Sequence, residues 1–348
     1  MNIIIRVDAS IEIGSGHVMR CLTLADFLQE KGAEVAFICA NLEGNMIDFI
    51  RENRYKVFPI GKGLGNVIDA KATIDILNEH QVDLLIVDHY QIDSNWEKTI
   101  KEKYYSIKLM VIDDLANREH ECDLLLDQNY FKNLNNRYDH LIPAHCRKLL
   151  GPKYLLLRPE FYLGDKVKKA YKTIQDILVF YGGSDPTNET LKVLEAFDRL
   201  EVSNINVHVV VGLSNGKRDH IKEICAETQY SYYEQIDYIA SLMRKSDLAL
   251  GAGGVTMWER CFLGLPSIVT VVAENQIGST HAAAEYGAIW NLGWHESVNM
   301  SNYVDIINRV LASPEMLTGM SNRARRLMHS EITYHTHPVV EAILEVLE

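Results

Sequence analysis

Two glycines and a histidine stand together near the start of the chain, in the sequence Gly14-Ser15-Gly16-His17. An apolar run precedes them and an amphipathic stretch over residues 18–30 follows, so they lie between a predicted strand and a predicted helix. Glycines let the backbone approach a ligand closely, and a helix N-terminus offers unpaired N–H groups and a positive dipole end. The same dipole disfavours an imidazolium ion, so His17 stays neutral and suits general-base catalysis. We therefore predict a catalytic histidine, with loop capping as the alternative.

The neighbours of this loop narrow its chemistry. Met19 stands where the dinucleotide fingerprint G-x-G-x-x-G has its third glycine, so NAD binding is not expected. Arg6 and Asp8 flank the end of the preceding strand and are predicted to form an ion pair that holds the loop. Arg20, one turn into the helix, either binds phosphate or pairs with an acid, and the sequence leaves both roles open.

A second glycine-rich turn, residues 251–254 (GAGG), ends a predicted strand in the second half of the chain. A helix is expected to begin next to it, so the N–H groups of residues 254–256 can bind a pyrophosphate without a metal. Glu259 lies on the first turns of that helix, where its carboxylate can accept two hydrogen bonds from ribose hydroxyls. The alternative is a glutamate on a solvated helix face. The turn therefore predicts a site for a nucleoside diphosphate.

Other titratable residues support weaker predictions. Asp88 is expected to orient a neighbouring side chain, and His89 is a candidate for a second base. The carboxylate pair at residues 113–114 follows a predicted strand and is expected to cap a loop rather than to exchange protons. The H-x-H sequence at residues 335–337 lacks a third ligand, which is typical of surface histidines rather than of a metal site.

These residues depend on a repeating pattern of strands and helices. Apolar runs of strand length alternate with amphipathic stretches, which is the pattern of parallel sheets built from βαβ units. In the first half the runs cover residues 3–7, 35–40, 83–88, 108–113 and 123–127. In the second half they cover 176–181, 206–212, 247–251 and 267–272, with helical segments near 301–312, 314–329 and 335–347. Several runs end in aspartate, at the edge where ligands of open α/β sheets bind.

The regular pattern breaks over residues 151–172, which is typical of a crossing between domains. We therefore predict two Rossmann-like domains. Residues 1–157 form the first, with the glycine–histidine loop. Residues 158–348 form the second, with the nucleotide turn and a helical C-terminal extension.

The composition is that of an ordinary globular protein and disfavours several classes of function. Of 348 residues, 47% are apolar and 24% charged, and the net charge of −12 disfavours nucleic acid and anionic membranes as partners. No apolar stretch approaches the roughly 20 residues of a membrane-spanning helix, and the N-terminal apolar run is too short for a signal peptide. The six cysteines are scattered without a C-x-x-C pair, which suits a reducing compartment. We therefore expect a cytoplasmic protein.

The nucleotide turn and the residues after it resemble a known pattern. The nucleotide half of GT-B glycosyltransferases, in particular the family that adds N-acetylglucosamine to the peptidoglycan lipid precursor, has a glycine–alanine turn, a glutamate, a G-x-P and a polar–glutamine pair. Here the matching residues are Gly251-Ala252, Glu259, Gly264-x-Pro266 and Asn275-Gln276. Trp258 departs from the smaller polar residue expected before the glutamate, so the sugar or phosphate pocket is expected to differ in shape.

A closer resemblance starts at the N-terminus and extends into the second half of the chain. Its patterns are R-x-D-x-S-x-x-I-G-x-G-H-x-M-R-C-L-x-L-A from Arg6, Asp88-His89-Tyr90, G-P-x-Y-x-L-L-R-P-E-F from Gly151, and Gly182-Gly183-Ser184-Asp185. Together they resemble the UDP-2,4-diacetamido-2,4,6-trideoxy-β-L-altropyranose hydrolases of pseudaminic acid biosynthesis and their spore-coat polysaccharide relatives. The likeness runs from residue 3 to about residue 290.

This resemblance implies an α/β protein of GT-B type, with two Rossmann-like domains facing each other across a cleft. It implies hydrolysis at the anomeric carbon of a UDP-sugar, with release of UDP and without a metal; no other cofactor is expected. Our mechanistic hypothesis is that this hydrolysis inverts the anomeric configuration. His17 would activate water, Tyr90 would lie near the sugar, and Glu259 and Asn275 would lie in the nucleotide and sugar site. The other expected binding residues are Gly14, Ser15, Gly16, Arg158, Gly183, Ser184, Gly254, Val255 and Thr256.

Three alternatives stay open. A GT-B glycosyltransferase would pass the sugar to an acceptor and should carry a basic or apolar acceptor surface, which is not evident in the first half. A hydrolysing UDP-N-acetylglucosamine 2-epimerase has a similar fold, but the opening motif fits it poorly. A non-catalytic nucleotide-sugar binding module would keep residues 251–276 and lose His17 or Tyr90, and this chain has both. The identity of the sugar and the oligomeric state are left open.

Overall fold

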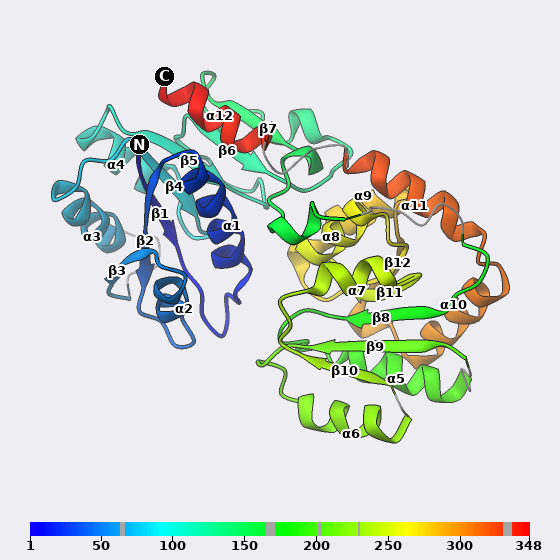
Figure 1. The fold of residues 1–348 in the computed structure, drawn as a ribbon. Helices are drawn as coiled ribbons and strands as arrows, with labels where there is room; N and C mark the ends of the chain where they lie inside the picture. Colours follow the sequence, from blue (N-terminus) through cyan, green and yellow to red (C-terminus); the bar gives the residue numbers. More distant parts are fainter. Residues whose placement is uncertain (63–66, 165–170, 201–203, 229, 330–335) are drawn as a thin grey trace. The chain divides into compact units, whose positions relative to one another are not determined.

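A computed structural model describes residues 1–62, 67–164, 171–200, 204–228, 230–329 and 336–348, which form two compact units (Figure 1). Unit 1 contains Met1–Asn129, Asn133–Leu157 and Ile332–Glu348, and unit 2 contains Tyr130–Lys132 and Arg158–Glu331. Each unit has one parallel β-sheet with helices packed on it. Within these described ranges, no helix is long and apolar enough to cross a bilayer.

The sheet of unit 1 has seven parallel strands in the order β3-β2-β1-β4-β5-β6-β7. The strands are β1 (Asn2–Val7), β2 (Glu34–Ala40), β3 (Lys56–Ile60), β4 (Leu84–Asp88), β5 (Lys108–Ile112), β6 (Leu124–Asp127) and β7 (Arg147–Leu150). The helices are α1 (Gly16–Glu30), α2 (Ile47–Glu52), α3 (Val67–Asn78), α4 (Ser94–Lys103) and α12 (Pro338–Leu347), with short 3₁₀ turns at Leu134–Asn136 and Pro152–Tyr154. The strand order reverses between β1 and β4, so the carboxyl ends of these two strands flank the switch point where open α/β sheets bind ligands.

The sheet of unit 2 has six parallel strands in the order β10-β9-β8-β11-β12-β13. The strands are β8 (Asp176–Phe180), β9 (Asn206–Val211), β10 (Ser231–Glu234), β11 (Leu248–Ala252), β12 (Ser267–Val271) and β13 (Trp290–Trp294). The helices are α5 (Glu189–Leu200), α6 (Arg218–Thr228), α7 (Ile239–Lys245), α8 (Val255–Leu263), α9 (Ile277–Tyr286), α10 (Met300–Ala312) and α11 (Met316–Leu327), with 3₁₀ turns η3 (Pro159–Phe161), η4 (Glu274–Gln276) and η5 (His295–Ser297). Here the order reverses between β8 and β11, which form the second switch point.

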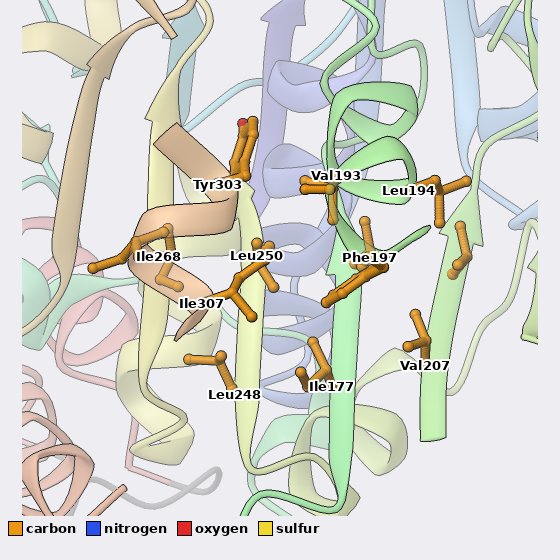
Figure 2. Packing of buried hydrophobic residues seen from close by; sticks show 14 of the residues in the cluster. Ile177, Val193, Leu194, Phe197, Val207, Leu248, Leu250, Ile268, Tyr303 and Ile307 are labelled. Atoms are coloured by element: carbon orange, nitrogen blue, oxygen red, sulfur yellow. The ribbon is translucent and has the colours of Figure 1, made fainter. Parts of the chain in front are cut away.

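The hydrophobic core of unit 2 packs α5 and α10 against the strands that flank its switch point. Figure 2 shows side chains of Ile177, Leu248 and Leu250 from the central strands packed with Phe197 of α5 and Ile307 of α10. All five are buried. Truncating a buried phenylalanine to alanine costs about 3–5 kcal/mol in proteins, so this layer fixes α5 and α10 against the strands.

Four strands were not predicted from the sequence, and all four lie at sheet edges. They are β3 and β7 in unit 1 and β10 and β13 in unit 2. Edge strands are less buried and lack the long apolar run, as the sequences RKLL of β7 and SYYE of β10 illustrate. β3 also contains Pro59, which a central strand would exclude because proline has no N–H to donate. The central strands were predicted because burial on both faces selects apolar side chains.

The C-terminal helix corrects the predicted domain organisation. We expected residues 158–348 to form one domain, but α12 belongs to unit 1 and packs against α1. His337 is buried there: Nδ1 accepts from the Val339 N–H, and Nε2 donates to the Leu155 carbonyl oxygen at 3.1 Å. The prediction of surface histidines is therefore wrong for His337, while residue 335 lies outside the described residues. An apolar helix face does not reveal which domain it will cover.

Candidate active site

The loop after β1 and the start of α1 lie at the switch point of unit 1. Gly14 has a φ of 79°, a left-handed conformation that favours glycine, and its N–H closes the loop on the Ser10 carbonyl oxygen at 2.8 Å. α1 begins at Gly16, and Ser15 occupies the N-cap position without a side-chain cap. His17 is consequently the second residue of the helix, as the spacing of the motif predicts.

His17 is held by a carboxylate from the other strand at the switch point. Its Nδ1 lies 2.6 Å from Oδ1 of Asp88, the last residue of β4. An ionised carboxylate only accepts hydrogen bonds, so Nδ1 carries the proton and Nε2 holds the lone pair. Among the described residues, none hydrogen-bonds to Nε2, and the side chain keeps 10% of its surface exposed. The imidazole is therefore a base with a fixed tautomer and an available lone pair.

Arg20 keeps Asp88 ionised. Its Nε donates to Asp88 Oδ2 at 2.6 Å and its Nη2 to Asp88 Oδ1 at 2.7 Å, and both side chains are buried. Burial by itself raises the pKa of the Asp88 carboxyl, but the interactions with Arg20 and His17 outweigh it and hold that pKa well below its usual value. Of the two roles left open for Arg20, the structure has the pairing with acids.

Asp114, which follows β5, extends this network. Its Oδ2 accepts from Arg20 Nη1 at 2.9 Å and from the Tyr90 hydroxyl at 3.1 Å. The Tyr90 ring packs edge-on against the imidazole of His17, with ring centroids 4.5 Å apart and an interplanar angle of 84°. Asp113 instead accepts hydrogen bonds from two N–H groups of the following loop. The predicted loop cap is therefore confirmed for Asp113 and wrong for Asp114.

A buried carboxyl, Asp127, lies next to Asp114. The side-chain amide of Asn129 joins them, with Nδ2 at 2.9 Å from Asp114 Oδ1 and 3.1 Å from Asp127 Oδ1. Burial and the charge of Asp114 raise the pKa of Asp127 to about 6, although Arg137 acts in the opposite direction. The network around His17 thus continues across β4, β5 and β6.

A second cluster braces the start of the loop. Arg6 donates to Asp8 Oδ1 through Nη1 and to Asp69 Oδ2 through Nη2, each at 2.5 Å and fully buried, so the predicted pair of Arg6 and Asp8 is confirmed. His89 accepts from the Gln91 N–H through Nδ1, and its Nε2 lies 3.2 Å from Asp8 Oδ2. Because both ring nitrogens of His89 face protein groups, this geometry does not favour it as a second base.

The glycine-rich turn of unit 2 follows β11 at the second switch point. A Cβ at Gly253 would lie 2.6 Å from Thr280 Oγ1, and Gly254 has a φ of 83° at the N-cap of α8, so both positions require glycine. Val255 and Thr256 form the first turn of α8 and are half-buried. The N-terminus of α8 has no side-chain cap, and its N–H groups are of the kind that bind anions.

Glu259 is buried on α8 with 6% of its surface exposed, so the alternative of a solvated glutamate is wrong. Arg158 is its cationic neighbour, with Nη2 3.6 Å from Glu259 Oε1 and Nη1 3.0 Å from Glu160 Oε1. Burial raises the pKa of Glu259, and Arg158 acts against this shift. Trp258, which we expected to alter the pocket, is fully buried and forms part of the core.

The remaining predicted residues of unit 2 lie on loops after β8 and β12. Gly183 and Ser184 are exposed after β8, and Asp185 caps the start of α5. Asn275 is exposed on the short helix η4 after β12. Because β8, β11 and β12 are neighbours in a parallel sheet, these loops emerge at the same edge as the glycine-rich turn.

The sequence motifs did not reveal how Asp88, Arg20 and Asp114 combine. One signal was available, since Asp88 and Asp114 each follow an apolar run and belong to neighbouring strands β4 and β5. Strand order is not readable from the chain, however, so the contact could not be inferred. In the described part of the chain, no three His, Cys, Asp or Glu side chains are grouped to hold a metal ion.

Comparison with solved structures supports one fold. MurG from Acinetobacter baumannii superposes with a TM-score of 0.67 at 12% identity, covering 99% of this chain and 98% of that one. Spinosyn rhamnosyltransferase SpnG complexed with spinosyn aglycone gives a TM-score of 0.64 at 14% identity, covering 99% of each chain. Such identities show the fold alone, and the predicted GT-B class of α/β fold is confirmed.

Comparison of sequences gives a family match and several relatives. Residues 177–311 match the glycosyltransferase family 28 C-terminal domain. The UDP-2,4-diacetamido-2,4,6-trideoxy-β-L-altropyranose hydrolase of Campylobacter jejuni is 32% identical over 205 residues, which is 59% of this chain and 69% of that protein. The spore coat polysaccharide biosynthesis protein SpsG of Bacillus subtilis is 23% identical over 99% of both chains. The uncharacterised protein MJ1062 of Methanocaldococcus jannaschii is 31% identical over 80% of this chain, which spans 56% of that protein's length.

Proposed function

Because the chain belongs to the family of UDP-2,4-diacetamido-2,4,6-trideoxy-β-L-altropyranose hydrolases, we propose that it hydrolyses a UDP-linked 2,4-diacetamido-2,4,6-trideoxyhexose. The products are UDP and the free sugar, in a pathway of the pseudaminic acid type. The observation that carries this proposal is the pair of His17 and Asp88, which leaves the Nε2 lone pair of the imidazole available for a proton. Another relative, from Helicobacter pylori, is named both as this hydrolase and as a pseudaminic acid cytidylyltransferase.

His17 is the general base in this proposal. Its Nε2 takes a proton from a water molecule as the water oxygen forms a bond to the anomeric carbon. The bond from that carbon to the diphosphate oxygen breaks on the opposite face, so the anomeric configuration inverts. Asp88 holds the imidazole by Nδ1 and stabilises the imidazolium that forms. A base in this position contributes about 10²–10⁴-fold to the rate.

Unit 2 binds the nucleotide in this proposal. The N–H groups of residues 254–256 bind the diphosphate, and they stabilise the charge that develops on it as the bond breaks. Glu259 accepts hydrogen bonds from ribose hydroxyls, with Arg158 beside it. Gly183, Ser184 and Asn275 contact the diphosphate or the sugar from the neighbouring loops. In unit 1, Tyr90 and the loop Gly14-Ser15-Gly16 contact the sugar in this proposal.

The remaining parts of the proposal concern conditions. The reaction needs no metal or other cofactor, since the helix N-terminus supplies the donors for the diphosphate. It takes place in the cytoplasm, which six buried cysteines without disulfides support. Nucleic acid is not a partner, in keeping with the net charge of −12.

The test is UDP release from a panel of UDP-sugars, with and without added acceptors, for the wild type and His17→Ala. Release from a 2,4-diacetamido-trideoxyhexose substrate in water alone, abolished in the variant, is the expected result. Release that requires an acceptor would contradict hydrolysis.

A GT-B glycosyltransferase is the second candidate. Two observations favour it, namely the family 28 match and the loop after β1, in which Ile11 is 74% exposed and Ile13 is 36% exposed. Exposed apolar side chains on the loop that leads to His17 can bind an apolar acceptor. Transfer of labelled sugar to an organic-soluble product, in the same assay, would select this candidate.

A further inference from the structure

We propose that Asp114 is a positioning residue that selects the tautomer of His17. The inference rests on the proposed function, because it gives Asp114 a part in making His17 a base. Asp114 acts through two neighbours, accepting hydrogen bonds from Arg20 at 2.9 Å and from the Tyr90 hydroxyl at 3.1 Å.

Two groups compete for Nδ1 of His17. Asp88 Oδ1 lies 2.6 Å from it, and Arg20 Nη2 lies 3.2 Å from it. A carboxylate oxygen requires a proton on Nδ1, whereas a guanidinium N–H requires a lone pair there. The first contact leaves the lone pair on Nε2. The second moves the proton to Nε2 and removes the base, so the position of Arg20 decides whether His17 can take a proton from water.

Asp114 sets the position of Arg20 from the other side of the guanidinium. Its two oxygens accept from Nη1 at 3.1 and 2.9 Å, while Nε and Nη2 donate to Asp88. The guanidinium is a rigid planar fork, so anchoring Nη1 fixes the direction of Nη2. Held between two carboxylates, Nη2 donates to Asp88 Oδ1 at 2.7 Å rather than to the imidazole.

Because Arg20 and its two carboxylate partners are largely buried, the loss of one partner is costly. The side chains of Arg20, Asp88 and Asp114 are 5%, 0% and 12% exposed. Removing the charge of Asp114 leaves Arg20 with one carboxylate in a site where water has little access. A buried donor that loses its partner is costly, so Nη1 and Nη2 will turn toward other acceptors. One such acceptor on the Nη2 side is Nδ1 of His17, at 3.2 Å.

Asp114 also holds the aromatic ring of Tyr90, which packs on the imidazole of His17 and limits its orientation. The Tyr90 hydroxyl donates to the same Oδ2 that accepts from Arg20. The Tyr90 ring then packs edge-on on His17 at 4.5 Å between centroids. One carboxylate therefore controls both the hydrogen-bond competition at Nδ1 and the aromatic contact on the ring.

The test is ¹⁵N NMR of protein labelled at histidine, because the nitrogen chemical shifts report which ring nitrogen carries the proton. His17 is assigned among 13 histidines by its loss in His17→Gln. The wild type is expected to show the Nδ1–H tautomer. Asp114→Asn is expected to show the Nε2–H tautomer for at least part of the population, with kcat lowered about 10-fold and KM changed less than about twofold.

Asp123→Asn is the matched control. The Asp123 side chain has a similar exposure of 13% and an ion pair with Lys101 at 2.7 Å. However, it precedes β6 and so lies at the amino-terminal ends of the strands, whereas His17 and Asp88 lie at the carboxyl ends. It is expected to leave the His17 signals unchanged. Unchanged His17 signals in Asp114→Asn, or an equal change in both variants, would overturn the proposal. Asp114→Ser carries the same expectation if Asp114→Asn does not fold.

The NMR readout separates this inference from the proposed function. If His17→Ala keeps normal UDP release, the assignment of the base fails. The tautomer of His17 in Asp114→Asn still tests the role of Asp114 in that case, because the measurement needs no turnover. Asp114→Glu keeps the charge and is expected to retain more of the Nδ1–H tautomer than Asp114→Asn; an equal loss would contradict the role of the charge.

Discussion

The switch points of the two units present different chemical groups, mainly polar side chains in unit 1 and backbone N–H groups in unit 2. In unit 1, hydrogen bonds of 2.6–3.1 Å join four polar side chains, those of His17, Asp88, Arg20 and Asp114. In unit 2, the corresponding edge offers a glycine-rich turn and the N-terminus of α8, with Glu259 as its buried carboxyl. A side chain that moves a proton needs partners that fix its tautomer, whereas an anion is bound well by N–H groups that do not titrate.

The two units also differ in the pKa of their buried carboxyl groups: that of Asp88 in unit 1 is lowered, and that of Glu259 in unit 2 is raised. Asp88 has a bidentate partner in Arg20 at 2.6 and 2.7 Å, and its pKa lies well below the usual value despite burial. Glu259 has Arg158 at 3.6 Å, and burial raises its pKa. For these two buried acids, the contact geometry with a cation, rather than burial alone, sets the direction of the pKa shift.

The largest expected effect is that of His17→Ala, which tests whether unit 1 supplies the catalytic base. If unit 1 supplies the base, kcat falls about 10²–10⁴-fold and KM changes little, because the lost interaction belongs to the transition state. Steady-state UDP release gives both constants. A large rise in KM with normal kcat would instead make His17 a binding residue, and the contrast between the two units would be lost.

Glu259→Gln tests the other side of the comparison. If the carboxylate binds ribose hydroxyls, its loss removes hydrogen bonds to a charged group, each worth about 1.5–3 kcal/mol. KM for the UDP-sugar should then rise about 10–100-fold with kcat little changed. Glu195→Gln, on an exposed position of α5, is the control for a lost charge in unit 2. An effect on kcat alone would give Glu259 a role in the chemical step.

The buried histidines of unit 1 extend the comparison to stability. His17 faces a carboxylate, whereas His337 hydrogen-bonds to backbone groups, and burial lowers the pKa of His337 to about 4. The unfolded chain therefore binds a proton at His337 that the folded chain rejects, between about pH 6.5 and 4. Stability is full above that window and is lost as the pH falls through it.

Urea unfolding at pH 7 and pH 5 measures this effect. The wild type should lose about 2 kcal/mol of unfolding free energy through His337 between these values. His337→Asn keeps a side chain suited to the N-cap of α12 and should lose that part of the pH dependence. Equal pH dependence in the two proteins would contradict the assignment.

Tyr90→Phe is the smallest expected effect and sharpens the description of unit 1. The ring stays on His17, and the hydrogen bond from the hydroxyl to Asp114 at 3.1 Å is lost. A hydrogen bond to a charged group contributes about 1.5–3 kcal/mol, but this one reaches the reaction only through the position of Asp114, so kcat should fall by less than that energy allows, about 2–10-fold. Tyr90→Ala removes the ring as well and should lower kcat further. A rise in KM for Tyr90→Phe would indicate that the hydroxyl contacts the sugar.

Spacing along the chain was enough to predict the parts that local structure determines. The central strands were predicted because a strand buried on both faces must be apolar. The four edge strands were missed because their exposed sides relax that requirement, as Pro59 in β3 illustrates. His17 at the start of α1 and Gly254 at the start of α8 followed from motifs whose glycines have a backbone role that the sequence displays.

The tertiary structure decided which distant residues meet. Asp88 is 71 positions from His17, and Asp114 is 94 positions from Arg20, yet each pair is in hydrogen-bond contact. These contacts depend on the order β1-β4-β5 in the sheet, which no local pattern encodes. The docking of α12 on unit 1 depends in the same way on a complementary face far away in the chain. Local sequence patterns were enough to predict the central strands and the motifs at their ends. The charge and tautomer of the site depend on contacts that form only when the strands assemble side by side.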